Sequence, residues 1–175
     1  MLSDPTGSAR QLTRSGRDYD PKLSPDGRLV AFCRKVGVDF FSGQIWLVSA
    51  SENPKEWLVR DSGVSYQKFS LTGCETPDFS PNGKYLYYLL QFSATSGVIS
   101  RVDLASGDVV AMTDAIGFRV ISVGQYRGYF AAYKRKHTLT RVWSWCWLLD
   151  PDGKEVGAIG DEEAEQDFIR IYERE

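Results

Sequence analysis

Histidine is nearly absent from this sequence, which has a single one, His137, among 175 residues. A triad-type hydrolase needs a histidine beside its nucleophile, and the serine signature G-x-S-x-G does not occur in the chain. Three scattered cysteines and one histidine lack the ligand spacing of a zinc site. Glycine-rich phosphate loops are missing as well. These absences favour a protein that is not an enzyme and that needs no metal or other cofactor.

Long apolar runs are also missing. None approaches the roughly 18 residues of a membrane span, and the first residues, MLSDPTGSARQLTRSG, contain no apolar signal-peptide core. The cysteines (Cys33, Cys74 and Cys146) are odd in number and far apart, which favours buried reduced thiols over a disulfide framework. We therefore expect a cytoplasmic chain without a membrane span. A periplasmic location is the alternative if the chain is a mature form that has lost its signal.

A basic excess is the third absence. The formal net charge is -2, which argues against a dedicated nucleic-acid binder. The charges are nevertheless uneven, because residues 10–35 hold seven Arg or Lys against three Asp, while residues 161–175 hold seven acids against two Arg. Two solvated surfaces would explain this, and so would attraction between the two ends of the chain.

Two similar stretches, DYDPKLSPDGRLVAF (18–32) and TPDFSPNGKYLYY (76–88), carry the strongest structural signal. In each, a proline presets the first corner of a type I turn, Asp or Asn takes the second, and a glycine accepts the left-handed conformation that closes a hairpin. The turn residues are Pro25, Asp26 and Gly27 in the first copy and Pro81, Asn82 and Gly83 in the second.

The runs after these turns are apolar on both faces, so the strands are expected to lie in sheets stacked on either side. Four strands can be assigned before each new start, which is typical of a propeller blade. We predict an all-β fold in which residues 1–175 form a single domain of about three antiparallel four-stranded blades, at 18–60, 74–115 and 118–160.

The third blade lacks the proline turn but ends in a clear hairpin turn, Asp150-Pro151-Asp152-Gly153. Before that turn, Trp143, Trp145 and Trp147 alternate, so their side chains share one face. Such a stripe could stack against a sugar, but a packing layer between sheets is the commoner use of aromatic residues and is the interpretation we favour.

Two spare strands remain, at 9–13 and 168–172. Propellers have about four to eight blades, so three blades leave the ring open. The spare strands could form a thin fourth blade, the ring could close between chains, or the chain could be part of a longer protein. Two copies would supply six blades, with residues 9–13 pairing at an edge of the partner's third blade, and this homodimer is slightly favoured.

The pattern P-x-x-S-P-D-G-x-x-x-A-F at residues 21–32, followed by the strand QIWLV, resembles the β-propeller repeat of the TolB family, shared with the propeller domains of prolyl-oligopeptidase-type peptidases. Residues 77–88 match it well, and residues 118–160 match it only in strand layout and turn. Leu23 and Phe79 stand where the family usually has tryptophan. The resemblance implies TolB-like blades but no catalysis, because those peptidases keep their nucleophile on a separate hydrolase domain.

The best candidate for an interaction site is a group of cations on one predicted hairpin: Lys134, Arg135, Lys136 and Arg141. The acidic net charge disfavours a nucleic-acid partner, so an acidic protein surface or a solvated edge is expected there. We accordingly predict a non-catalytic module for protein–protein interaction or self-assembly. A propeller that binds a carbohydrate or small molecule, as a lyase would, is the alternative.

Overall fold

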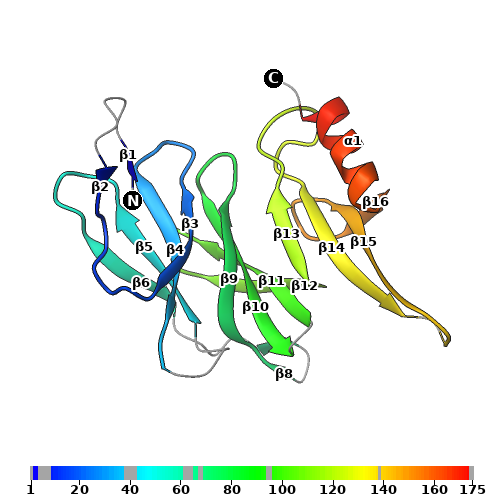
Figure 1. Ribbon diagram of the computed structural model, residues 1–175, viewed down its shortest axis with the longest axis horizontal. Coiled ribbons are helices and arrows are strands. Elements are labelled where there is room, and N and C mark those ends of the chain that lie inside the picture. Colours follow the sequence, from blue (N-terminus) through cyan, green and yellow to red (C-terminus); the bar gives the residue numbers. More distant parts are fainter. Residues whose placement is uncertain are drawn as a thin grey trace.

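The computed structural model of the chain is built mainly from antiparallel β-strands (Figure 1). It describes residues 2–3, 9–37, 43–60, 65–66, 69–93, 96–137 and 139–173. The strands of this part of the chain form three four-stranded sheets and two two-stranded sheets, and one helix follows them. This confirms the predicted all-β architecture with three four-stranded blades.

Each four-stranded sheet is one blade, and its strands follow one another along the chain. Blade 1 consists of β3 (Asp18–Leu23), β4 (Leu29–Lys35), β5 (Gly43–Ser49) and β6 (Glu56–Arg60). Blade 2 consists of β9 (Thr72–Phe79), β10 (Tyr85–Ser93), β11 (Ser96–Asp103) and β12 (Val109–Ala115). Blade 3 consists of β13 (Gly117–Val120), β14 (Phe130–His137), β15 (Val142–Leu149) and β16 (Glu155–Gly160).

The remaining strands are short. β7 (Ser65–Tyr66) pairs with β8 (Phe69–Ser70) between blades 1 and 2. β2 (Ala9–Arg10) pairs with β1 (Leu2–Ser3) in a two-stranded sheet of its own. The spare strand predicted at 9–13 is therefore only two residues long within the described chain, and it does not extend any blade.

Successive blades pack face to face through the residues that follow the proline turns. Val30 and Phe32 of blade 1 correspond to Leu86 and Tyr88 of blade 2, 56 positions further along. Leu86 and Tyr88 are buried in the core between blades 1 and 2. Their neighbour Tyr87 points the other way, into the core between blades 2 and 3. The apolar run that begins at Tyr85 is thus nearly continuous because β10 is covered by another blade on each of its two faces.

Cys33 of blade 1 and Cys74 of blade 2 form a disulfide across the first of these cores. The prediction of reduced thiols is wrong for this pair, because the packing of two sheets brings their Cα atoms within 5.8 Å although 41 positions separate them in sequence. Cys146 is the free cysteine; it is buried, and burial raises the pKa of its thiol to about 12.

The predicted strand at 168–172 is also wrong, because this segment belongs to the helix α1 (Glu162–Tyr172). Asp161 caps the helix by accepting a hydrogen bond from the N–H of Ala164 at 3.1 Å. Phe168 and Tyr172 lie on one side of α1, where both contact the ring of Tyr126. The alternative of a thin fourth blade built with these residues is therefore wrong.

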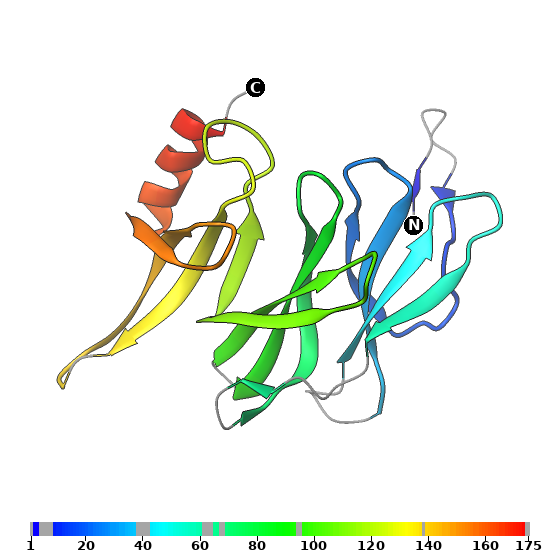
Figure 2. The same ribbon diagram turned by 180° about the vertical axis from the view of Figure 1, so that it is seen from behind.

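The three blades form an open arc in the described chain (Figures 1 and 2). The innermost strands β3, β9 and β13 lie side by side in the middle of the molecule. β1 and β2 lie beside blade 1 at one end of the arc, and α1 lies beside blade 3 at the other end. The two ends of the arc thus present the two sheet faces that have no blade packed against them.

Candidate functional site

The first proline turn is held by its own polar groups. Ser24 Oγ donates to Asp26 Oδ1 at 2.7 Å and accepts a hydrogen bond from the N–H of Leu29 at 2.9 Å. Gly27, which follows Pro25 and Asp26, has a φ of 71°, the left-handed region that a glycine adopts without strain. These side chains serve the hairpin itself.

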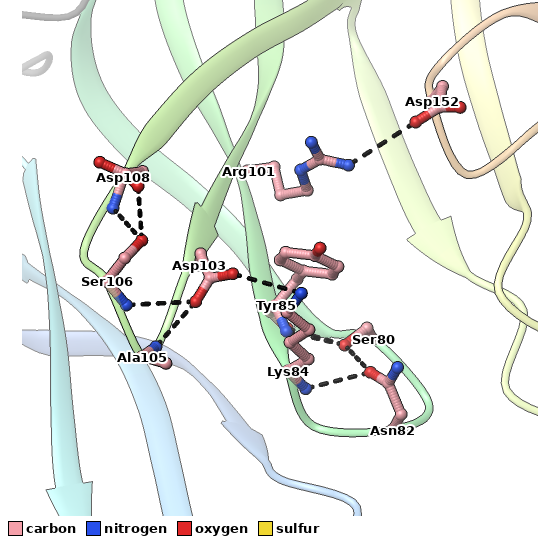
Figure 3. A network of polar contacts seen from close by, with 10 residues as sticks. All are labelled: Ser80, Asn82, Lys84, Tyr85, Arg101, Asp103, Ala105, Ser106, Asp108 and Asp152. Carbon is pink, nitrogen blue, oxygen red and sulfur yellow. Dashed lines mark hydrogen bonds and ion pairs between the residues drawn. The ribbon is translucent and has the colours of Figure 1, made fainter.

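The second turn repeats this arrangement (Figure 3). Ser80 Oγ donates to Asn82 Oδ1 at 2.7 Å and accepts from the N–H of Tyr85 at 2.9 Å. Gly83 has a φ of 69°. The carbonyl oxygen of Pro81 accepts a hydrogen bond of 3.1 Å from Arg127 of blade 3, so this turn also ties two blades together.

Figure 3 shows a further polar network on blade 2. The carboxylate of Asp103 accepts hydrogen bonds from the N–H groups two and three residues further on, at 2.9 and 3.2 Å, and these lower its pKa. Lys84 lies 3.6 Å from the same carboxylate. Arg101 stacks over the ring of Tyr85 at 4.7 Å and lies 3.8 Å from Asp152 of blade 3. The network holds turns and blades together.

The predicted cation cluster is divided by the fold. Lys134 is only 5% exposed, and its ammonium group contacts Thr113 at 3.0 Å, Asp114 at 3.4 Å and Glu155 at 2.9 Å. Lys136 also pairs with Glu155, at 2.8 Å. Hydrogen bonding to Lys136 and then to Lys134 lowers the pKa of Glu155. Lys134 therefore joins blades 2 and 3 internally and is not available to an external partner.

The other two cations of the cluster stand near the free end of the hairpin. Arg135 is half-buried on β14, and Arg141 is exposed just before β15. The alternation of a strand explains the division, because Lys134 shares its face with its cross-strand partner Trp145 and with the core residue Ala132, whereas Arg135 points to the opposite face.

The tryptophan stripe is only partly a packing layer. Trp147 packs against the core between blades 2 and 3, and the ammonium group of Lys136 lies 4.5 Å from its ring centre. Trp143 is half-buried and Trp145 is exposed. Because a cation already occupies one side of the Trp147 ring, the stripe does not offer three free rings for a sugar.

Two kinds of site are not found among the described residues. No group of three or more His, Cys, Asp or Glu side chains in the described ranges is arranged to hold a metal ion. In the same part of the chain, no helix is long and apolar enough to cross a membrane.

The outer face of blade 1 is formed by Leu23, Val30, Phe32, Trp46 and Val48, which face away from blade 2. Residues 9–13 lie over part of this face, with Leu12 packed against its buried side chains. A hollow of about 420 Å³ remains between this segment and the sheet. Leu23, at the edge of the face, is 46% exposed.

Arg34 forms the polar border of this face. Its guanidinium donates to both carboxylate oxygens of Asp18, at 2.6 and 3.0 Å, and to Glu56 at 2.8 Å. It also lies over the rings of Trp46 and Phe32, at 4.6 and 5.1 Å. Burial would raise the pKa of Asp18, but hydrogen bonds, above all from Arg34, lower it overall. The border is therefore fixed, and behind it Val30, Phe32 and Val48 are buried.

The free face at the other end of the arc is covered. α1 lies on the side of blade 3 that faces away from blade 2. Glu165 accepts hydrogen bonds from the hydroxyl of Tyr133 and from Arg119, and Glu173 also pairs with Arg119, at 2.6 Å. The bond to Glu165 raises the pKa of Tyr133. This polar network and the aromatic contacts of the helix close the face.

The sequence does not indicate the hollow, because its pattern predicts a spare blade strand at residues 9–13. A weak signal is Gly16, a poor strand former three positions after this segment.

Comparisons with known proteins identify solved structures that have a similar fold. No family model matches the chain, and no curated protein matches it either. Among solved structures, TolB from Acinetobacter baumannii superposes with a TM-score of 0.63 over 90% of this chain and 36% of that protein, at 15% sequence identity. A gluconolactonase from Xanthomonas campestris superposes with a TM-score of 0.57 over 91% of this chain and 54% of that protein, at 16% identity.

These likenesses show a TolB-like propeller fold. The chain spans about a third of the length of the TolB structure and about half of the gluconolactonase structure. Because one neighbour is named for an enzymatic activity and the other is not, the shared fold does not decide what this chain does.

Proposed function

We propose that the chain is a non-catalytic protein-binding module that docks a partner on the outer face of blade 1. The observation that carries the proposal is the hollow of about 420 Å³ at this face, lined in part by Leu12, Val30, Phe32 and Val48. At the edge of the same face Leu23 is 46% exposed, and exposed apolar surface is a common mark of a protein interaction site.

The repeat itself indicates what fits there. The residues of blade 2 that correspond to Val30 and Phe32, namely Leu86 and Tyr88, are buried against the preceding blade. The outer face of blade 1 is the equivalent of the blade 2 face that packs on blade 1. Among the described residues, no blade precedes blade 1 to cover it. A partner that offers apolar side chains from a sheet or an extended segment would bury this face as a neighbouring blade does.

The two-chain ring is not part of the proposal. A six-bladed ring from two copies would pack the outer face of blade 1 against the far face of the partner's blade 3. α1 covers that far face and is tied to it through Arg119 and Tyr133. Ring closure would therefore require removal of the helix, so we favour a different protein as the partner.

A small-molecule ligand is the second candidate, and it has one observation in its favour. The volume of the hollow lies in the range of roughly 300–1,000 Å³ that is typical of ligand pockets. A sugar is not favoured, because Lys136 lies over the Trp147 ring that a three-tryptophan platform would need.

We also infer that the chain works in an oxidising compartment, such as the periplasm, and not in the cytoplasm. The disulfide between Cys33 and Cys74 supports this inference, since such bonds persist in oxidising environments and are rare in the cytosol.

Site-specific photo-crosslinking in the producing cells tests the binding proposal. A photoreactive phenylalanine analogue replaces Leu23 at the outer face of blade 1, or Val110 of blade 2 as the control; their exposed fractions are 46% and 47%. We expect a crosslinked protein of discrete mass at position 23 and none at position 110. Ala9→Trp, which adds a ring at the wall of the hollow, should abolish that product while leaving the melting temperature unchanged.

Equal products at both positions, or none at position 23, would overturn the proposed protein partner. Native mass spectrometry of the purified chain distinguishes a small-molecule ligand from a protein partner. A small bound mass that is present in the parent chain and absent in Ala9→Trp would favour the ligand.

A further inference from the structure

Half of the β14–β15 hairpin extends beyond its sheet. Within the described residues, β13 pairs with β14 as far as Tyr133, and β16 pairs with β15 as far as Cys146. Four more cross-strand pairs, from Lys134 with Trp145 to His137 with Val142, continue without a neighbouring strand. We call residues 134–137 and 139–145 the ribbon. Figures 1 and 2 show it projecting from blade 3, away from blades 1 and 2.

The ribbon carries apolar side chains that an isolated chain leaves in water. Leu139, at the turn, is fully exposed, Val142 is exposed, and Trp145 is 44% exposed. Trp143 lies between the last two and is half-buried. A two-stranded ribbon alone is marginally stable in water. Exposed apolar side chains gathered at its projecting tip indicate that the tip contacts a membrane or another molecule.

Two arginines of the ribbon, Arg135 and Arg141, lie in the sequence close to these side chains. The other cations of residues 116–149 are held by partners within the chain: Arg119, Arg127, Lys134 and Lys136. On one face of the ribbon, Trp143 lies opposite Lys136 and Trp145 lies opposite Lys134. Tryptophan and long basic side chains sit at the headgroup level of membranes, with apolar residues placed deeper, and Trp145 and Arg135 are the candidates for this level here.

We propose that the tip of the ribbon inserts into the surface of an anionic lipid bilayer. Leu139 and Val142 would enter the acyl boundary, Trp145 would lie at the headgroups, and Arg135 and Arg141 would contact lipid phosphates. Leu139 lies at the turn of the ribbon, Arg141 and Val142 follow it, and Trp143 and Trp145 lie nearer to the sheet.

The dimensions of the ribbon favour a bilayer over a protein partner. Its unpaired part is about 13 Å long, at roughly 3.3 Å for each of four residues, and its two strands are about 4.8 Å apart. Each face therefore offers several-fold less area than the roughly 800 Å² per partner of a stable protein interface. A bilayer needs no matching surface, only insertion and charge.

The remaining charges orient the molecule for this contact. Residues 161–175 contain seven acids against two Arg. α1, which begins in this segment, and the tip of the ribbon lie at opposite ends of blade 3 (Figures 1 and 2). An anionic surface attracts the ribbon and repels the helix, so the ribbon is the part of blade 3 that approaches the lipid.

Vesicle co-sedimentation tests the proposal on the whole chain. The probes are phosphatidylcholine vesicles with and without phosphatidylglycerol. We expect binding to the anionic vesicles, a blue shift of tryptophan emission, and quenching by brominated lipid. Since each cation near an anionic surface contributes roughly five-fold to partitioning, Arg135→Glu combined with Arg141→Glu should weaken binding by at least about ten-fold. Leu139→Asp should weaken it without affecting the fold, because this side chain is fully exposed.

Matched controls lie on blade 1. Trp57→Ser removes a tryptophan that is 41% exposed, close to the 44% of Trp145, and should leave binding unchanged where Trp145→Ser weakens it. Arg28→Glu with Lys55→Glu controls for the reversal of two charges. Failure of the parent chain to bind anionic vesicles, or an equal loss in the blade 1 controls, would overturn the proposal. So would ribbon variants that bind vesicles normally but lose the protein crosslinked at position 23, since the ribbon would then serve a protein.

Discussion

The Oδ2 atom of Asp78 accepts a hydrogen bond of 2.9 Å from the backbone N–H of Val120, so one carboxylate of blade 2 holds the innermost strand of blade 3. Its other oxygen, Oδ1, lies 3.0 Å from the ammonium nitrogen of Lys22 on blade 1. Asp78 is buried, whereas about half of the Lys22 side chain is exposed. All three blades are thus connected through one side chain.

Replacing Asp78 should therefore affect stability more than replacing its partner on the surface. We expect Asp78→Ala to lower the free energy of unfolding by about 2–4 kcal/mol, because the N–H of Val120 loses its acceptor in a buried site. Asp78→Asn, which keeps an acceptor oxygen, should cost less. Lys22→Met should cost less than about 1 kcal/mol, as expected for a half-exposed ion pair. Urea denaturation measures all three, and equal losses for Asp78→Ala and Lys22→Met would contradict the assignment.

The proline turns give a second prediction. Gly27 and Gly83 have positive φ and no atom near the position of an added Cβ, so a side chain there meets backbone strain and no clash. Gly27→Val or Gly83→Val should cost on the order of 1–3 kcal/mol of unfolding free energy. Gly83→Asn should cost less, because asparagine tolerates this region. Gly117→Ala is the control, since Gly117 has neither a positive φ nor a close neighbour. Thermal or urea unfolding that ranks Gly117→Ala with the valine variants would argue against these turns.

The disulfide can be tested by counting thiols. The denatured chain should show one reactive thiol, that of Cys146, before reduction and three after it. Because the bond closes a loop of 41 positions, reduction should lower the free energy of unfolding by up to about 4 kcal/mol on the chain-entropy model. Three reactive thiols in the unreduced chain, purified from an oxidising compartment, would refute both the bond and the inferred location.

Acid should weaken the contact between blades 2 and 3. The pKa of Glu155 is lowered in the folded chain by Lys136 and Lys134, so its stabilising effect is complete above its ordinary pKa of 4.5 and is lost as the pH falls through the lowered folded-state value. Glu155→Gln should cost on the order of 1–2 kcal/mol at neutral pH, because buried Lys134 loses one of its partners. The variant should also lose less stability than the parent on acidification. Urea titrations at neutral and acidic pH measure the difference, and parallel losses would exclude Glu155 as a source of acid sensitivity.

The blades could be predicted because their signals are local. Each turn needs a proline, an Asp or Asn and a glycine at fixed spacing, and the next strand follows directly at Leu29 or Tyr85. The wrong prediction of a strand at 168–172 also comes from relying on local signals. Phe168-Ile169-Arg170-Ile171-Tyr172 is rich in strand-forming residues, but the N-cap at Asp161 and the acidic first turn of α1 favour a helix that runs through it.

The candidate sites depend on contacts between distant parts of the chain, so the sequence could not reveal them. The hollow on blade 1 exists because Leu12 crosses a sheet face instead of joining a sheet. The burial of Lys134 depends on Asp114 and Glu155 from other strands, which only the packing of blades 2 and 3 brings together. Likewise, Cys33 and Cys74 meet only after two sheets have stacked.

The bond between Cys33 and Cys74 has a mechanical consequence. If the chain is pulled from its two ends, blade 3 and α1 can unravel completely, but the 41 positions between these cysteines stay closed until the bond is reduced. At roughly 3.4 Å per residue, the closed loop prevents about 140 Å of extension. A chain anchored at one end and bound to a partner at the other would lengthen under load in two stages, and only the second would depend on a reductant.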